Sequence, residues 1–453
     1  MNHLTPAYDL VVGLGRSGLS MARFLKSVGR NVVATDIDPL KKKEAGLLES
    51  LGIQTMIGAH DQTVFDKAST IIPSPGIPLA IDPIKNAAAK GVSITGELDI
   101  FFQYNTTPVI AVTGTNGKTT TTSLVGEMIK ASGFSCFVGG NIGTPLVDYL
   151  LLGSPRDFVV AEISSFQLDL AKTFTPHVGV LLNISSDHLD RYPDFRAYED
   201  SKWSVFANQG PKDIAVINKE IQGISRKKAV IQSQVFEFSS RSQVSLGASI
   251  KEDTIQIRTP KEKVDICVKE IQGLAGIHNQ ENIAAAALAV LGAGGSLQGI
   301  THALANFTPL GHRMAFVKQL DGIRFFNDSK ATNTDAVLRA LESFDSPVIL
   351  ILGGREKRTD FTQLIPGITP HVKQIMAIGE SKENIMAIFK DRLPVFQCTD
   401  MAHAVADAYL SAAPGDVVLL SPACASFDMY ADYEERGRDF EAQVSHLGNG
   451  GLL

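Results

Sequence analysis

The hydrophobic positions of the chain fall into short runs, each followed by a glycine-rich or polar loop and then by a helical pattern. Such runs are "YDLVVGLG", "NVVATD", "TIIPSPG", "PVIAVTG", "FVVAEIS", "VGVLLNIS", "IAVIN", "PVILILGG", "QIMAIG" and "DVVLLSP". Strands that alternate with helices in this way predict parallel sheets covered by helices on both faces. The predicted fold class is therefore α/β.

One region departs from this pattern. Between residues 234 and 269, the stretches "VFEFSS" and "DTIQIRTP" alternate polar and apolar residues. Alternation is typical of strands with one face in solvent, as in antiparallel sheets. We therefore expect an antiparallel addition to the middle domain.

The length of 453 residues exceeds what one hydrophobic core supports and predicts several domains. A polar connection marked by proline lies at residues 105–108, and a helical pattern gives way to an extended one at residues 308–311. These breaks predict domains at residues 1–104, 105–308 and 309–453.

Composition narrows the class of protein. The net charge of -6 argues against nucleic acid as a partner, because nucleic-acid binding usually needs a basic face. No apolar stretch approaches the roughly 18 residues of a membrane span, and the N-terminus does not resemble a signal peptide. The four cysteines form no CxxC pair or zinc-type cluster. We expect a cytoplasmic, soluble protein with reduced thiols and no membrane insertion.

The first glycine loop is "GLGRSG", with Gly13, Gly15 and Gly18, and Asp36 ends the next predicted strand. This context is that of a dinucleotide fingerprint, which indicates NAD. Two other interpretations stay open: the glycines form only a tight turn, or the helix N-terminus binds a different diphosphate.

The second glycine loop is "GTNGKTT", at residues 114–120. It differs from the usual GxxxxGK[ST] pattern because Val112 occupies the position of the first glycine. Gly114 and Gly117 still allow backbone N–H groups to face phosphate, Lys118 can reach the β and γ oxygens, and Thr119 offers a hydroxyl to Mg²⁺. The loop predicts ATP binding.

A carboxylate ends the next apolar run, at Glu162 in "FVVAEISS". An isolated buried carboxylate is costly, so a metal ion or a lysine partner should lie beside it. Asp187 and His188 follow the next predicted strand, at the same expected sheet edge.

The ordered motifs "TGTNGKTT", "GNIGTPL", "AEISSFQL", "LNISSDHLDRY", "GIHNQEN", "LGHRM", "NDSKATN" and "LSPACASFD" resemble those of the Mur ligases of peptidoglycan synthesis over nearly the whole chain. Among these ligases, "DHLDRY", "NDSKATN" and "SPACASFD" most resemble the members that add D-glutamate. The resemblance implies a Rossmann-like N-terminal domain that holds UDP rather than NAD. It further implies a central P-loop ATPase domain with a mostly parallel sheet and a Rossmann-like C-terminal domain.

The same resemblance implies a reaction. ATP phosphorylates the carboxylate of UDP-N-acetylmuramoyl-L-alanine, and D-glutamate attacks the acyl phosphate to form an amide. Two Mg²⁺ ions and a carbamylated Lys202 accompany the family's chemistry. A monomer is expected, with these two substrates and ATP as its partners.

Residue roles follow from the same motifs. Catalysis is implied for Lys118, Glu162, His188, Lys202 and Arg313, and metal binding for Thr119, Glu162, His188 and Lys202. ATP binding is implied for Gly114, Thr115, Asn116, Gly117, Lys118, Thr119, Thr120, Asn279, Arg313, Asp328 and Lys330. Substrate binding is implied for Gly15, Ser17, Asp36, Ser74, Asn141, Thr332, Lys357, Ser426 and Phe427.

Simpler explanations remain for several of these residues. Lys202 could be a surface lysine, Arg313 could form an inter-domain ion pair, and Asn279 or Asn282 could cap a helix. Cys424 lies beside a motif but has no histidine partner nearby, so we expect no role for it. His188 is a candidate for the group that takes the proton from the incoming amine.

Three other functions compete with this interpretation. A ligase for a diamino acid or a folate would share the ATP chemistry, but a second amine would need an acidic pocket rather than Lys357 and Ser426. An NAD-dependent dehydrogenase would leave Lys118 and Glu162 unexplained. The third alternative is a nucleotide-sensing module without catalysis.

Ile37 and Tyr433 depart from the residues expected in close relatives, so uridine recognition near Ile37 is open.

Overall fold

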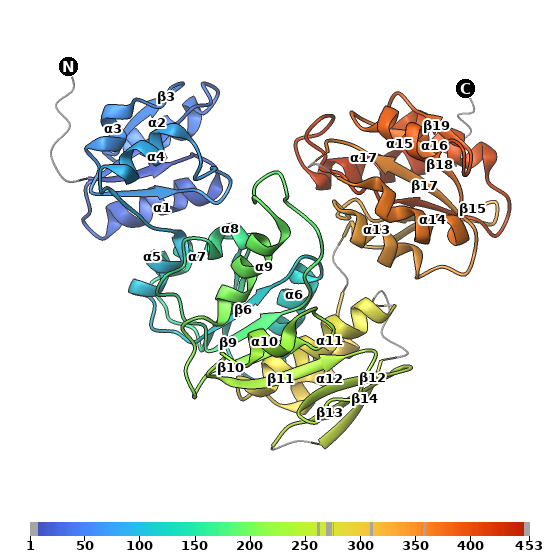
Figure 1. The fold of residues 1–453 in the computed structure, drawn as a ribbon, viewed down its shortest axis with the longest axis horizontal. Helices are drawn as coiled ribbons and strands as arrows, with labels where there is room; N and C mark the ends of the chain where they lie inside the picture. The colour runs from blue at the N-terminus through green and yellow to red at the C-terminus, as the bar shows by residue number, and fades with distance from the viewer. Residues whose placement is uncertain are drawn as a thin grey trace. The chain divides into compact units, whose positions relative to one another are not determined.

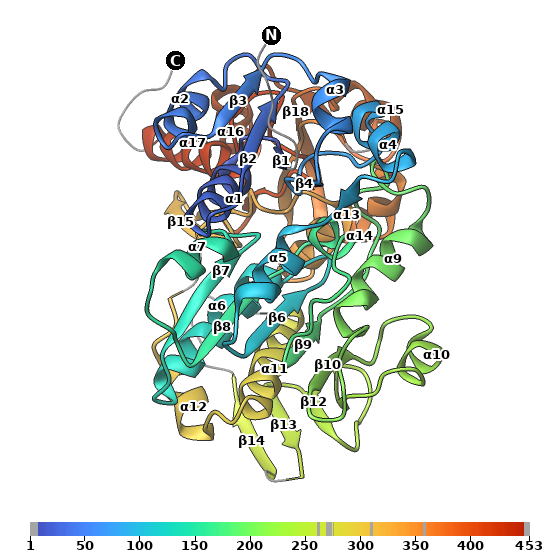
Figure 2. The same ribbon diagram turned by 90° about the vertical axis from the view of Figure 1, so that its left-hand side faces the viewer.

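The computed structural model describes residues 8–260, 263–268, 274, 276–308, 311–356 and 359–447. Within these ranges the strands form sheets of five, nine and six strands (Figures 1 and 2). Contacts group the chain into two compact units. The first unit is Met1–Ile184, Arg196–Ile266 and Glu281–Ala305, and the second is Ser185–Phe195, Cys267–Gln280 and Asn306–Leu453. The predicted boundary between residues 308 and 309 falls at the edge of the described residues.

The N-terminal sheet is parallel and has the order β3-β2-β1-β4-β5. Its elements are β1 (Asp9–Val12), α1 (Arg16–Ser27), β2 (Val32–Asp36), α2 (Lys42–Ser50), β3 (Gln54–Ile57), α3 (Gln62–Asp66), β4 (Thr70–Pro73), α4 (Asp82–Ala89) and β5 (Ser93–Ile94). Apolar residues of α1 and α2 pack on one face, and those of α3 and α4 pack on the other. The strand ends that precede glycine and polar loops therefore lie along one edge.

The central sheet has the order β14-β13-β12-β11-β10-β9-β6-β8-β7. Its strands are β6 (Val109–Thr113), β7 (Cys136–Gly140), β8 (Phe158–Glu162), β9 (Val178–Leu181), β10 (Ile214–Asn218), β11 (Gln234–Ser239), β12 (Gly247–Lys251), β13 (Thr254–Arg258) and β14 (Lys263–Cys267). Its helical segments are α5 (Glu97–Tyr104), α6 (Lys118–Ala131), α7 (Leu146–Leu151), α8 (Ser165–Leu168), α9 (Phe195–Trp203), η1 (Ser204–Phe206), α10 (Ile224–Lys228), α11 (Ile277–Gly292) and α12 (Leu297–Ala305). Strands β6 and β8 are buried throughout, as expected for parallel strands covered on both faces.

The predicted antiparallel addition is wrong for its first strand. Strand β11 pairs in parallel with both β10 and β12, whereas β12 and β13 are antiparallel. Alternate residues of β13 are buried. Alternation reports that one face of a strand is covered, and it does not report the direction of the neighbouring strand.

The C-terminal sheet has the order β15-β16-β20-β17-β18-β19 and is parallel except for the β15–β16 pair. Its elements are β15 (Ala315–Leu320), β16 (Ile323–Asn327), α13 (Thr334–Leu341), β17 (Val348–Gly353), η2 (Phe361–Leu364), α14 (Ile365–His371), β18 (Val372–Ile378), α15 (Lys382–Phe389), β19 (Val395–Gln397), α16 (Met401–Ser411), β20 (Val417–Leu420) and α17 (Tyr433–His446). Helices α13, α14 and α15 cover one face, and α16 and α17 cover the other.

A buried carboxylate links α5 to two other helices, α7 and α8. Glu97 accepts hydrogen bonds from the backbone N–H of Leu146 at 3.0 Å and from Nε2 of Gln167 at 3.1 Å. Burial raises the pKa of Glu97 to about 6, although these hydrogen bonds offset part of the effect. The carboxylate thus connects the segment that precedes β6 to α7 and α8.

This link predicts a pH-dependent stability. Folded Glu97 holds its proton more tightly than the unfolded chain, so the unfolding free energy should fall as pH rises from about 4.5 through 6, by about 2 kcal/mol in total. The variant Glu97→Gln should lose that part of the pH dependence. Urea unfolding at pH 5 and pH 7.5 can be followed by the fluorescence of Trp203, the single tryptophan, which packs in the same core as Leu98. Glu127→Gln, on the exposed side of α6, is the control, and equal pH slopes for wild type and Glu97→Gln would contradict the prediction.

Candidate active site

The loop at residues 114–117 joins β6 to α6, as the sequence predicts. Gly117 has a φ of 83°, and a Cβ there would lie 2.2 Å from Oδ1 of Asn282, so both conformation and space require glycine. Asn282 also accepts a hydrogen bond from the hydroxyl of Thr121 at 3.3 Å. The loop and the first turn of α6 are therefore held against α11.

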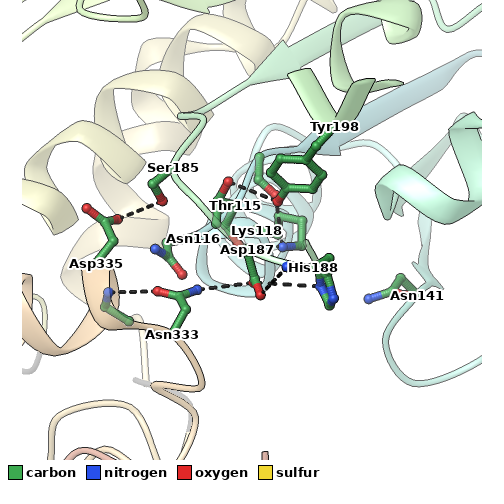
Figure 3. A network of polar contacts seen from close by, with 12 residues as sticks. Thr115, Asn116, Lys118, Asn141, Ser185, Asp187, His188, Tyr198, Asn333 and Asp335 are labelled. Carbon is green, nitrogen blue, oxygen red and sulfur yellow. Dashed lines mark hydrogen bonds and ion pairs between the residues drawn. The ribbon is translucent and has the colours of Figure 1, made fainter. Parts of the chain in front are cut away.

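The loop is stabilised from the neighbouring strand end. Asn183 accepts a hydrogen bond from the backbone N–H of Asn116 at 2.8 Å and donates to the carbonyl of Asn116 at 3.0 Å. Nζ of Lys118 donates to the carbonyl oxygens of Gly114 at 2.9 Å and Thr115 at 2.7 Å, which places the ammonium over the loop (Figure 3). A backbone cradle with a lysine above it suits a polyphosphate. Asn183 lies in the motif "LNISSDHLDRY", but the sequence assigned it no role, and its contact with the loop is visible only in the fold.

Glu162 ends β8 beside this loop and is 2% exposed. Oε1 accepts a hydrogen bond from Nδ2 of Asn141 at 2.9 Å, and Oε2 is buried without a hydrogen-bond partner among the described residues. No lysine among the described residues forms an ion pair with Glu162, so the structure does not support the alternative of a lysine partner. A buried carboxylate oxygen without a partner is costly unless a cation or donor binds there.

Lys202 is 2% exposed near the end of α9, so the surface-lysine alternative is wrong. Its Nζ donates to the carbonyl of Gly114 at 2.8 Å and lies 4.6 Å from the ring centroid of Tyr198. The hydroxyls of Tyr198 and Thr115 are 3.0 Å apart (Figure 3). Two lysines, Lys118 and Lys202, therefore converge on the carbonyl of Gly114.

The first glycine loop lies at the end of β1. A Cβ at Gly18 would lie 1.8 Å from the carbonyl oxygen of Gly13, so close packing requires this glycine. Asp36 accepts a hydrogen bond from the backbone N–H of Leu14 at 2.6 Å, and the hydroxyl of Ser74 donates to the carbonyl of Gly13 at 2.9 Å. The predicted residues Asp36 and Ser74 thus meet the loop.

Gly15 and Ser17 lie at the start of α1. A Cβ at Gly15 would meet no atom within 4 Å, so packing within the chain does not require this glycine. Its exposed backbone at the helix start leaves room for an approaching diphosphate.

His188 belongs to the second unit, where it lies in a network of carboxylate and amide side chains. His188 has a φ of 56°, its N–H donates to Oδ1 of Asp187 at 2.8 Å, and Oδ2 of Asp187 accepts from Nδ2 of Asn333 at 3.3 Å. The hydroxyl of Ser185 donates to Asp335 at 3.1 Å (Figure 3). The segment that carries His188 is therefore tied to the start of α13.

The predicted residues of the C-terminal domain follow strand ends. Asp328 accepts hydrogen bonds from Ser421 at 3.0 Å and from the N–H of Met314 at 3.3 Å. Burial raises the pKa of Asp328 to about 7, and the charge of Arg313 offsets part of this shift. Nζ of Lys330 lies 3.6 Å from the ring centroid of Tyr433.

Three further predicted residues belong to the C-terminal loops. Thr332 is partly buried, Ser426 is 3% exposed and Phe427 is 61% exposed. Lys357 lies outside the described residues. Cys424 is buried, and burial raises the pKa of its thiol to about 12, which keeps it protonated. This burial agrees with the expectation that Cys424 has no chemical role.

The cap interpretation of Asn279 and Asn282 is wrong, because α11 begins at Ile277 and both residues lie inside the helix. Asn282 contacts the phosphate loop, as described above. The assignment of Asn279 to adenine stays a prediction.

Family models cover most of the chain. The Mur ligase MurD-like N-terminal domain matches residues 8–96, the Mur ligase middle domain matches residues 112–290, and the Mur ligase glutamate ligase domain matches residues 312–424. The chain belongs to the Mur ligase family.

Curated relatives support the same family. A UDP-N-acetylmuramoylalanine–D-glutamate ligase of Desulfosudis oleivorans is 44% identical over 447 residues, which cover 97% of this chain and 96% of the relative. A protein of the same name from Pelotomaculum thermopropionicum is 39% identical, with 97% and 98% covered. A pseudomurein peptide ligase type C of Methanothermus fervidus shares the fold at a TM-score of 0.63 and 18% identity, with 98% and 100% covered.

The family matches and the sheet topology of this Mur ligase confirm the predicted α/β fold, with a Rossmann-like N-terminal domain, a central domain and a C-terminal domain. The N-terminal glycine loop belongs to a Mur ligase domain, so the dehydrogenase alternative is wrong. None of the described helices is both long and apolar enough to cross a membrane.

The described residues of this Mur ligase fit a magnesium ion that also has phosphate ligands. No group of three or more His, Cys, Asp or Glu side chains within the described ranges could hold a metal ion. Glu162 nevertheless offers a buried oxygen without a partner, and Thr119 is the second residue of α6. Mg²⁺ is usually bound by one or two protein groups together with substrate phosphates, and this donor set is of that kind.

Proposed function

We propose that the protein is an ATP-dependent ligase that joins D-glutamate to UDP-N-acetylmuramoyl-L-alanine. The observation that carries the proposal is the pairing of a lysine-covered phosphate loop with the unpartnered Oε2 of Glu162. Relatives at 44% and 39% identity over nearly the full chain carry this activity in their names.

The proposed reaction proceeds through an acyl phosphate. A carboxylate oxygen of the L-alanyl group attacks the γ-phosphorus of ATP, and the bond to the β-phosphate oxygen breaks to release ADP. The amine of D-glutamate then attacks the acyl carbon, loses a proton, and expels inorganic phosphate as the amide forms. Activation is needed because a free carboxylate carries no adequate leaving group.

The residues of the central domain would stabilise the charge that this transfer moves. The N–H groups of residues 114–120 and the ammonium of Lys118 would hold the β and γ oxygens. Thr119 and Glu162 would hold Mg²⁺, which neutralises phosphate charge when bound. Asn141 fixes the orientation of Glu162, and we assign it a further contact with the muramoyl substrate.

The other domains would supply the remaining contacts. Gly15, Ser17, Asp36 and Ser74 would hold the UDP-sugar, in a domain that we place at residues 1–104. Asn279, Arg313, Asp328 and Lys330 would contact the nucleotide, and Thr332, Lys357, Ser426 and Phe427 would contact D-glutamate. We place the central and C-terminal domains at residues 105–308 and 309–453. His188 would serve the second metal or the proton transfer.

Lys202 is proposed to act as a carbamate. A buried ammonium near Mg²⁺ would repel the ion. After the ammonium loses a proton, its nitrogen can add to CO₂ and release a second proton, which gives a carbamate anion with oxygen ligands. Enzyme equilibrated with ¹³C-bicarbonate should show a carbamate carbon resonance that Lys202→Arg lacks. Lys212→Arg, at an exposed lysine, should retain the resonance. Absence of the resonance from wild-type enzyme with Mg²⁺ and ADP would contradict the assignment.

Phosphate release tests the proposed function. Purified enzyme is given ATP, Mg²⁺ and UDP-N-acetylmuramoyl-L-alanine, together with D-glutamate, L-glutamate, meso-diaminopimelate or L-alanine. We expect turnover with D-glutamate only. Turnover with meso-diaminopimelate instead would place the protein elsewhere in the family.

A further inference from the structure

Helix α17 contains an arginine with almost no exposed surface. Arg436 is 1% exposed, and its guanidinium makes three hydrogen bonds. Nε donates to the hydroxyl of Ser329 at 2.9 Å, Nη2 donates to the carbonyl of Ser329 at 2.7 Å, and Nη1 donates to the carbonyl of Cys424 at 3.0 Å. One side chain thus bridges two loops that are far apart in the sequence.

Burial of this guanidinium is energetically unfavourable. Among the described residues no carboxylate lies within ion-pair distance of Arg436. Burial lowers the pKa of its guanidinium to about 10, although Cys424 and the more distant charge of Asp428 offset part of the effect. A buried cation without a counter-ion in direct contact costs more than an apolar side chain of similar volume would. Stability of the fold therefore does not explain the arginine, whereas its fixed planar fork explains three simultaneous hydrogen bonds.

Both bridged loops carry residues to which the proposed function assigns ligands. Ser329 lies between Asp328 and Lys330, three residues before Thr332, and Cys424 lies two residues before Ser426. The hydroxyl of Ser329 also donates to the carbonyl of Tyr433, at the start of α17. The helix therefore fixes the 328–332 loop at more than one point.

Neighbouring contacts extend the same network to the segment that carries Arg313. Asn327 is fully buried, and its Nδ2 lies 2.8 Å from Nδ1 of His312 and 3.0 Å from the carbonyl of Gly437. His312 has a φ of 61°, and a Cβ at Gly437 would lie 2.3 Å from its Nδ1. Residues 436 and 437 of α17 thus contact three segments: the loop that carries Ser329, the loop that carries Cys424, and the segment that carries His312.

We propose that Arg436 is a positioning residue that holds the 328–332 and 424–427 loops in register, so that Thr332 and Ser426 bind one amino-acid substrate together. The inference rests on the proposed function, which assigns these two side chains to D-glutamate. Arg436 itself is buried beneath the loops and touches no substrate. Its removal should separate two groups that must act on a single small ligand, and affinity falls steeply when such groups are misplaced.

The test compares arginines two positions apart on α17. Arg436→Met keeps volume and removes the donors, Arg436→Lys keeps charge and loses the fork, and Arg438→Met alters an exposed arginine that lies 3.8 Å from Glu434. We expect Arg436→Met to raise the KM for D-glutamate roughly 10- to 100-fold. Arg436→Lys should give a smaller increase, and Arg438→Met should leave this KM within twofold of wild type. The KM for UDP-N-acetylmuramoyl-L-alanine should stay within twofold in all three.

These expected KM values distinguish a positioning role of Arg436 from a general destabilisation of the fold. A smaller folded fraction lowers kcat at unchanged KM, whereas misplaced loops raise the KM for D-glutamate so that excess D-glutamate restores the rate. Hydrogen exchange gives a readout without turnover. In Arg436→Met the amides of Ser329 and Ala425 should exchange faster, and those of β17 should not.

Each outcome decides a separate question. If wild-type enzyme shows no D-glutamate-dependent turnover, the proposed function fails. If wild type turns over but Arg436→Met matches Arg438→Met in KM and exchange, the inference fails. Should Arg436→Met not fold, Ser329→Ala decides, because it keeps the guanidinium in place and removes the acceptor of Nε together with the hydroxyl's hydrogen bond to the carbonyl of Tyr433. Its KM for D-glutamate should rise at least threefold, and an unchanged value overturns the inference.

Discussion

Replacement of Lys118 by alanine should lower kcat/KM for ATP by about 10³-fold. Nζ of Lys118 lies over the loop that would hold the triphosphate, where it donates to the carbonyls of Gly114 and Thr115. Its removal takes away the ammonium that would offset the charge that moves from the γ-phosphate to ADP. Steady-state phosphate release with varied ATP measures the effect.

Lys130→Ala provides a matched control on the same helix. Lys130 is near the last turn of α6, half exposed and 2.8 Å from Glu127, so its loss should change kcat/KM less than twofold. Circular dichroism should show that both variants fold. Retention of more than a tenth of wild-type kcat/KM by a folded Lys118→Ala enzyme would rule out ATP binding at this loop as the source of activity.

The strands were predictable because parallel strands buried on both faces leave continuous apolar runs. Strand β17, for example, is buried at every position from Val348 to Gly353. The direction of β11 was not predictable, because an alternating pattern depends on cover from one side and not on the neighbouring strand. The loop after β6 could be recognised from local sequence, since the glycines, lysine and threonine that suit a phosphate lie within a few residues of each other.

The contacts that orient these loops could not be predicted in the same way. Arg436 and Ser329 are 107 residues apart, and Asn183 and Asn116 are 67 residues apart. No local pattern distinguishes such side chains from exposed polar residues of a helix or loop. Tertiary structure alone shows that Arg436 is buried and that Asn183 holds the phosphate loop.

The buried polar groups are of two kinds: those that have hydrogen-bond partners within the protein and those that lack one. Glu97 and Arg436 have their hydrogen bonds satisfied within the protein and hold segments in place. Oε2 of Glu162 has no such partner among the described residues, although the side chain is equally buried. A buried polar atom without a partner needs an explanation, and Glu162 differs from the other such groups because it ends β8 beside the phosphate loop, where a ligand would supply the partner.

Glu162→Gln should therefore separate activity from stability. Loss of the carboxylate should reduce turnover at saturating Mg²⁺ by roughly 10²- to 10³-fold, because the several kcal/mol that a metal contributes to charge stabilisation are lost. In EDTA, the same variant should unfold with a free energy about 1–2 kcal/mol higher than wild type, because a neutral amide replaces a buried charged oxygen without a partner.

Urea unfolding in the presence of ligand provides a measurement that does not depend on activity. Mg²⁺ with ADP should raise the urea midpoint of the wild type, reported by Trp203, because ligands that bind only the folded state stabilise it. The shift should be much smaller in Glu162→Gln and unchanged in Glu127→Gln, at an exposed glutamate of α6. A destabilised Glu162→Gln in EDTA would show that Glu162 serves the fold. A full Mg²⁺–ADP shift in that variant would place the metal elsewhere.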